Sequence, residues 1–181
     1  MPPLTIHRHG YGFRLDGLRD DGRIGFYGAP DADPRTCPTI GSRPNPHEWQ
    51  RWTPAAFCVS YIHISPDPDC VCGWRVCARV TDLAGLPSGS GLDVSLRAND
   101  DIADRPIVAE VAAWGPTLPG VSDPPGTVRT TWLRLESRIW VRRDIPRPLA
   151  RKVSRRYPWA TVGRFGDLDE LATAVDIDGP A

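Results

Sequence analysis

The chain has 181 residues, with 22 basic and 22 acidic side chains and a formal net charge of zero. Because a chain of this length usually folds as one domain and can bury roughly 70% of its unfolded surface, we expect residues 1–181 to form a single domain that needs neither metal nor disulfides merely to fold. No window approaches the roughly 18 consecutive apolar residues of a membrane helix, and the start MPPLTIHRHG lacks the basic and apolar segments of a secretory signal, which together predict a cytoplasmic protein without a membrane partner.

The first predicted element is a β-hairpin over residues 4–27. Apolar and polar residues alternate on both sides of RDDGR, and Asp21-Gly22 is a typical tight reversal between strands. The next stretch, residues 29–54, contains six prolines and few apolar residues, so we expect a long proline-rich loop. A loop of this length within one domain is usually either functional or mobile.

Two tryptophans in this polar loop are difficult to bury in regular structure. Trp49 and Trp52, together with His47, could line a pocket for a small ligand or offer a stacking surface for a base. The competing interpretation is that both indole rings simply pack into the core of a β-rich domain.

Residues 57–64, FCVSYIHI, are predicted to form a strand because they are rich in β-branched and aromatic side chains. The turn SPDPD follows the strand, and CVCG follows the turn. The segment from 58 to 72 therefore brings together three thiols and one imidazole, those of Cys58, His63, Cys70 and Cys72.

This cluster has three interpretations. An odd count of five cysteines and a reducing compartment argue against a disulfide framework. Three thiolates and an imidazole would supply the four ligands of a closed structural zinc site. Cys58 and His63, however, point to opposite faces of a regular strand, and free cysteines are often just buried. Spacing alone leaves zinc and buried thiols both open, with Cys37 and Cys77 as reserve ligands.

Beyond the cluster, Val76, Val80 and Leu83 have the spacing of a short helix within residues 74–86. Residues 107–114 are predicted to form a strand that ends at Gly115, followed by a proline-glycine loop to residue 126. Residues 127–143 alternate over most of their length and fit one or two strands with arginines on the polar face.

Residues 148–157 are predicted to form a helix, since Leu149, Val153 and Tyr157 recur at i, i+4 and i+8 behind a proline in the first turn. A short strand, WATVGRF, follows. Asp167 with Glu170 has the spacing of a capping box, which predicts a C-terminal helix over residues 167–176. The resulting fold class is a strand-led α+β domain with an antiparallel or mixed sheet, two or three short helices and a zinc-clamped turn.

Basic residues concentrate in a strand-helix region, residues 134–164, which contains ten basic and only two acidic side chains. Such a local positive field attracts phosphates or an acidic partner, although arginines on a solvated face are often simply paired with acids. The residues that we expect to bind are Arg138, Arg142, Arg143, Arg147, Arg151, Lys152, Arg155 and Arg156.

The order of the motifs along the chain resembles that of a known group of proteins. Over roughly residues 10–160 the motifs are, in order, Gly12-Phe-Arg, EWQRWTP, Cys58, His63, PDPDCVCGW, IVAEVAAWG and RRY. This pattern resembles small proteins of actinobacteria and their phages that share a Trp-x-Pro, a cysteine, a histidine and a Cys-x-Cys-Gly. The resemblance implies that Cys58, His63, Cys70 and Cys72 act together, and it implies no activity. With it, zinc becomes the interpretation that we carry forward.

No catalytic motif is evident. The chain lacks His-Glu-x-x-His, the His-x-Glu and Pro-Cys-x-x-Cys of zinc deaminases, and a phosphate-binding glycine loop. We therefore expect a non-enzymatic binding module with a structural zinc, whose basic surface contacts nucleic acid or an acidic protein partner. The alternative is a small-ligand-binding protein or enzyme with a pocket under loop 29–54.

Overall fold

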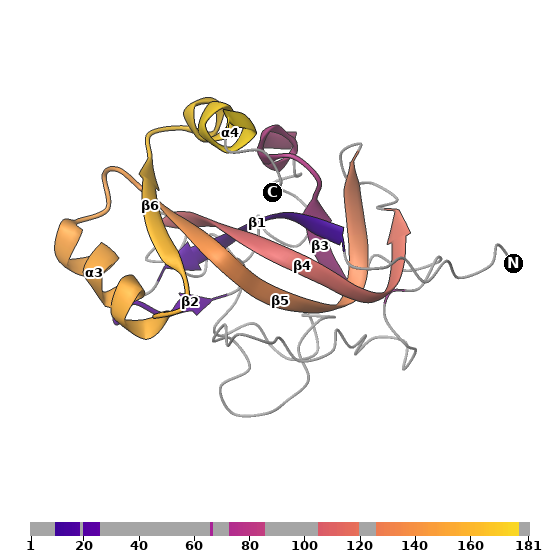
Figure 1. The fold of residues 1–181 in the computed structure, drawn as a ribbon, viewed down its shortest axis with the longest axis horizontal. Helices are drawn as coiled ribbons and strands as arrows, with labels where there is room; N and C mark the ends of the chain where they lie inside the picture. Colours follow the sequence, from indigo (N-terminus) through magenta and orange to yellow (C-terminus); the bar gives the residue numbers. More distant parts are fainter. Residues whose placement is uncertain are drawn as a thin grey trace, which may run out of the picture.

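The computed structural model describes residues 10–18, 20–25, 66, 73–85, 105–119 and 126–177. In chain order the elements are β1 (Gly10–Leu18), β2 (Ile24–Gly25), β3 (Trp74–Cys77), the 3₁₀ helix η1 (Val80–Gly85), β4 (Pro106–Pro119), β5 (Thr127–Arg142), α3 (Arg147–Arg156), β6 (Thr161–Phe165) and α4 (Leu168–Ile177). All six strands belong to one mixed sheet, so the expected strand-led α+β class is confirmed (Figure 1).

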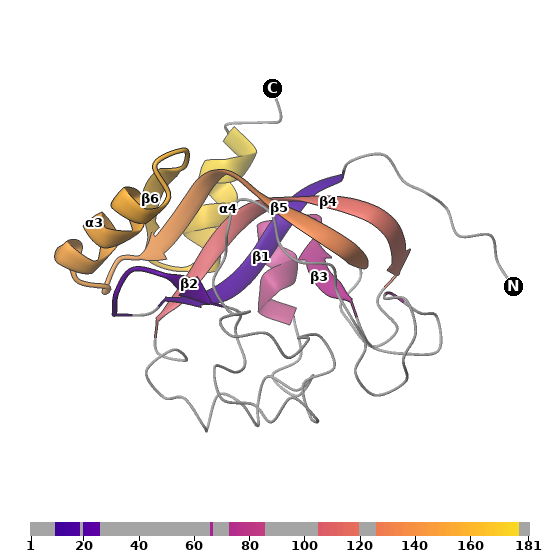
Figure 2. The ribbon, with the colours of Figure 1, turned by 90° about the horizontal axis from the view of Figure 1, so that it is seen from below.

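Four of the strands pair in a closed cycle. β1 runs antiparallel to β4, β4 runs antiparallel to the long β5, and the first part of β5 pairs with β3. The bridge between Phe13 and Cys77 then returns from β3 to β1. Figure 2 shows how β4 and β5 curve along most of the molecule, which allows β5 to reach β3 at one end. At the other end β6 lies parallel to β5.

The core has two parts on opposite sides of this sheet. Ile107, Ala109 and Val111 of β4 belong to one hydrophobic cluster, to which α3 contributes Leu149 and Val153. The alternate residue Val108 belongs to the other cluster, with side chains from η1, β6 and α4. The period of two along a strand explains this division, because successive side chains leave opposite faces. The long strands therefore hold both helices in place.

The hairpin predicted over residues 4–27 is confirmed for its described part, which consists of β1, the turn and β2. Its strands pair from Gly17↔Gly25 to Leu18↔Ile24, and Gly22 in the turn has a φ of 85°. A Cβ at this position would lie 2.6 Å from the Cβ of Lys152 on α3. Glycine is therefore required both for the backbone conformation and for the contact between the turn and the helix.

The helix expected over residues 74–86 is wrong in its first half. Trp74 and Val76 lie on β3 and pair with Thr130 and Val128 of β5. Only the segment from Val80 turns helically, as a 3₁₀ helix whose i, i+3 residues share one side. A tryptophan and a β-branched valine suit a strand, and the ladder offered by β5 outweighs the helical spacing.

The strand predicted to end at Gly115 continues as β4 to Pro119. Gly115 has a φ of 85° and lies where the register between β4 and β5 shifts, between the pairs of Trp114 and Thr117. The glycine therefore forms an irregularity within the strand and does not terminate it, as is common for glycine inside strands.

The remaining expectations for the C-terminal half are confirmed. Residues 127–142 form one continuous strand, α3 and β6 lie where they were predicted, and α4 begins after Asp167. Asp167 Oδ1 accepts a hydrogen bond from Glu170 N at 2.8 Å, while Glu170 Oε2 accepts one from Gly166 N at 2.8 Å. The reciprocal bonds of a capping box are thus present, with the second shifted by one residue.

Candidate polyanion-binding surface on helix α3

Helix α3 is attached to the β1–β2 turn on one flank. Lys152 Nζ donates a hydrogen bond to the backbone oxygen of Asp20 at 2.8 Å, and Ile24 N donates one to the hydroxyl of Tyr157 at 2.9 Å. Together with the close approach of Gly22, these contacts fix the orientation of the helix on the sheet. Lys152, one of the predicted binding residues, is therefore also engaged in holding the fold.

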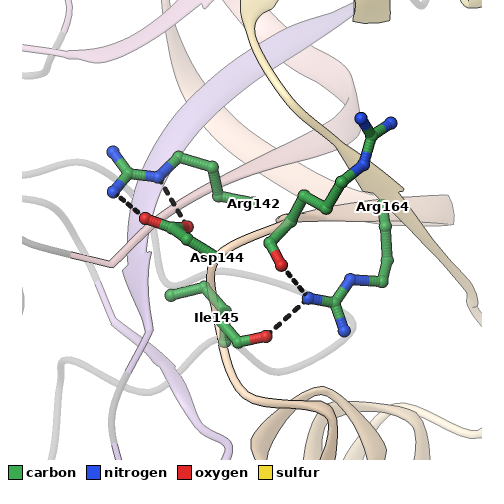
Figure 3. Close-up of polar contacts among 5 residues, drawn as sticks. Arg142, Asp144, Ile145 and Arg164 are labelled. Atoms are coloured by element: carbon green, nitrogen blue, oxygen red, sulfur yellow. Dashed lines mark hydrogen bonds and ion pairs between the residues drawn. The ribbon is translucent and has the colours of Figure 1, made fainter.

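The segment that leads from β5 into α3 is fixed by Arg164 of β6. Its Nη2 atom donates to the backbone oxygens of Arg143 and Ile145, as Figure 3 shows. Beside it, Arg142 Nε donates to Asp144 Oδ1 at 2.8 Å. The hydrogen bond from Arg142 holds the pKa of Asp144 below its usual value. These bonds set the position at which α3 begins.

Three arginines on or directly after β5 are paired with acidic side chains. Arg138 makes a bidentate ion pair with Glu110, with Nη2 2.8 Å and Nε 3.1 Å from the carboxylate oxygens. Arg142 pairs with Asp144, and Arg143 pairs with Glu170. Because Glu110 lies on β4 and Glu170 on α4, the excess of positive charge along residues 134–164 is partly neutralised in space.

Helix α3 itself has no acidic residue, and five of its ten residues are basic. Arg147, Arg151, Lys152, Arg155 and Arg156 are all exposed. Within the part of the chain that the structure describes, the side chains of Arg147, Arg151 and Arg155 form no hydrogen bond or ion pair. They recur at i, i+4 and i+8 and therefore lie in one row, with about 6 Å between successive residues. We call these three residues the arginine row.

The position of Arg147 is not explained by helix stability. It lies in the first turn, where the positive end of the helix dipole disfavours a cation, and neither an acidic residue nor a side-chain cap compensates there. Arg155 and Arg156, in the last turn, are favourable by the same rule. A basic residue at both ends gives α3 a continuous positive surface, which is the arrangement that attracts a polyanion.

A shallow hollow of about 380 Å³ lies beside α3. Its lining residues are Asp20, Arg105, Pro146, Pro148, Leu149 and Lys152. Arg105 pairs with the carboxylate of Asp20, and Lys152 donates to the backbone oxygen of the same residue, so both cations already have an oxygen partner. The hollow therefore adds little to the attraction of anions. The pocket predicted near His47, Trp49 and Trp52 lies outside the described residues.

Sequence reasoning missed the exposed aromatic side chains of the described strands and turns. Tyr11, Trp114, Trp132 and Trp159 are 65%, 45%, 38% and 38% exposed. Trp114 and Trp132 are opposite one another on β4 and β5, whereas Trp159 follows α3. The placement of Trp159 between a helix and a strand, next to Pro158, is the signal that could have indicated its exposure.

The predicted zinc ligands Cys58, His63, Cys70 and Cys72 lie outside the described residues. Among the residues that are described, no group of three or more histidine, cysteine, aspartate or glutamate side chains could hold a metal ion. The reserve ligand Cys77 is buried, with its sulfur 3.5 Å from Thr127 Oγ1. The zinc site therefore stays a prediction.

No protein-family model matches this sequence, and no similar chain was found among curated proteins or among solved structures. The resemblance in motif order described above stays a prediction. Across the described segments, no helix combines the length and the apolar character needed to cross a membrane.

Proposed function

We propose that the protein is a non-enzymatic binding module that contacts nucleic acid through α3. The observation that carries this proposal is the arginine row, which is exposed and unpaired among the described residues. Arg138, Arg142 and Arg143, on or directly after β5, are by contrast paired with acids. Guanidinium groups bind phosphate oxygens in bidentate fashion, and a row of them follows a backbone of repeated phosphates.

The proposal includes a structural zinc held by Cys58, His63, Cys70 and Cys72, which rests on the sequence. The zinc would stabilise the fold and would take no part in binding. The alternative function, a ligand pocket under loop 29–54, concerns residues outside those described and stays a prediction.

The test is binding of labelled DNA and RNA oligonucleotides by fluorescence anisotropy over a salt series. We expect the logarithm of the affinity to fall linearly with the logarithm of the salt concentration. Changing Arg147, Arg151 and Arg155 together to alanine should weaken binding and reduce the slope by roughly 2 to 3, because each lost phosphate contact removes about 0.7–0.9.

The matched control removes the same charge from three arginines that are paired with acidic side chains: Arg79, Arg134 and Arg143, whose partners are Asp82, Glu136 and Glu170. This triple alanine variant should keep most of the affinity and the slope of the wild type. Equal losses in both variants would show that only net charge matters. Absence of binding at low salt would remove nucleic acid, and binding to polyglutamate in its place would indicate an acidic protein partner.

A further inference from the structure

Trp159 lies directly beyond the arginine row. It follows the last residue of α3 by three positions, and its ring contacts that of Tyr157 edge to face, with the centroids 5.7 Å apart. Tyr157 is only 1% exposed and its hydroxyl accepts the hydrogen bond from Ile24 N. The indole is therefore oriented by a fixed neighbour, and it is still 38% exposed.

The other exposed tryptophans have a different electrostatic setting. Trp114 and Trp132 are register partners on β4 and β5, and Arg134, two residues beyond Trp132, pairs with Glu136. The charge of this neighbouring arginine is therefore compensated. Trp159 adjoins the helix with five basic residues and no acidic one. Among the described tryptophans, it combines an exposed ring with neighbouring unpaired arginines.

An oriented aromatic ring next to a row of cations suits one class of polyanion. Duplex nucleic acid keeps its bases stacked inside the helix, whereas single strands can place a base against an aromatic ring. We propose that the ligand of α3 is single-stranded nucleic acid, with one base stacked on Trp159 and the backbone along the arginine row. This inference rests on the proposed function and adds the class of nucleic acid.

The experiment compares three ligands of equal length: a thymidine oligonucleotide, an abasic oligonucleotide with the same phosphates, and a duplex. Wild-type protein should bind the thymidine strand more tightly than the abasic strand. Trp159→Ala should weaken binding of the thymidine strand by about 5- to 150-fold, which corresponds to the stacking of one base. Binding of the abasic strand and the salt dependence should stay unchanged, and Trp159→Phe should retain most of the affinity.

Trp114→Ala is the matched control, since it removes an exposed indole from β4, away from the arginine row, and should leave all three affinities unchanged. The thymidine and abasic strands are compared on wild-type protein, so this comparison tests whether a base contributes to binding even if Trp159→Ala unfolds. Equal affinity for these two strands, or tighter binding of the duplex, would overturn the inference while leaving the proposed function intact. If none of the three ligands binds, the proposed function itself fails.

Discussion

The polar contacts of Arg142, Asp144 and Arg164 show how single residues position the candidate surface. Arg164 binds two backbone oxygens in the segment before α3, and Asp144 in the same segment accepts hydrogen bonds from Arg142 (Figure 3). Backbone oxygens near a helix start need a donor when they are removed from water, and a guanidinium can satisfy two at once. These residues thus belong to the support of α3 and not to the surface that would meet a ligand.

A pH dependence follows from the lowered pKa of Asp144. The hydrogen bond from Arg142 favours the ionised carboxylate in the folded protein, so its contribution to the free energy of unfolding is complete above the usual pKa of 3.8. The contribution disappears as the pH falls through the lower, folded-state value. Asp144→Asn should therefore be less stable than wild type near neutral pH, and the difference should shrink in acid.

Chemical denaturation of both proteins, from about pH 6 to about pH 2, measures this difference. A gap that is constant over the whole range would contradict the role given to the Arg142 hydrogen bond. Asp21→Asn is a suitable control, because that carboxylate is also exposed and paired with an arginine but lies in the β1–β2 turn.

At the scale of elements, α3 combines an inner face that is typical of a packed helix with an outer face that stability does not require. Leu149 and Val153 bury against the sheet, and the hairpin turn holds the flank through Lys152. The side chains of the arginine row take no part in this packing. We propose that Arg147 serves binding, because the helix dipole disfavours a cation in the first turn.

Charge reversal at the two ends of α3 separates stability from binding. Arg147→Glu places an acid in the first turn and should raise the free energy of unfolding by about 0.3–1 kcal/mol. Arg155→Glu places an acid in the last turn and should lower it by a similar amount. Both changes should weaken binding of single-stranded DNA, because both reverse a charge of the arginine row.

Denaturant unfolding and fluorescence anisotropy, both measured on the two variants, compare the change in stability with the change in affinity. Parallel changes, with the more stable variant also binding better, would show that binding merely reports folding. Unchanged affinity in both variants would place the contact surface away from α3.

At the scale of the whole molecule, the strand cycle joins segments that are far apart in sequence. β1 pairs with β4, and β5 pairs with both β3 and β6. The predicted zinc ligands all fall within residues 58–72, outside the described residues, so a metal there would clamp one segment of the chain. We therefore expect zinc to add stability to a fold that the core largely supports.

Metal analysis of the purified protein tests the zinc prediction. We expect about one zinc per chain, lost in Cys70→Ser and in Cys72→Ser together with a lower melting temperature. Cys77→Ser is the control, because Cys77 is buried against Thr127 and should not be needed for the metal. Metal-free protein whose melting temperature is unaffected by the two substitutions would defeat the assignment.

The sequence by itself determined the elements that have a local cause. Asp21-Gly22 specifies the hairpin, the spacing of Leu149 and Val153 specifies α3, and Asp167 specifies the start of α4, because each signal acts within a few residues.

Other features of the protein became evident only from the tertiary structure. Residues 74–77 form a strand because β5 offers them a ladder, and the pairing of Arg138 with Glu110 separates the paired arginines from the arginine row. These features arise from contacts between distant segments, whose energies no local pattern contains.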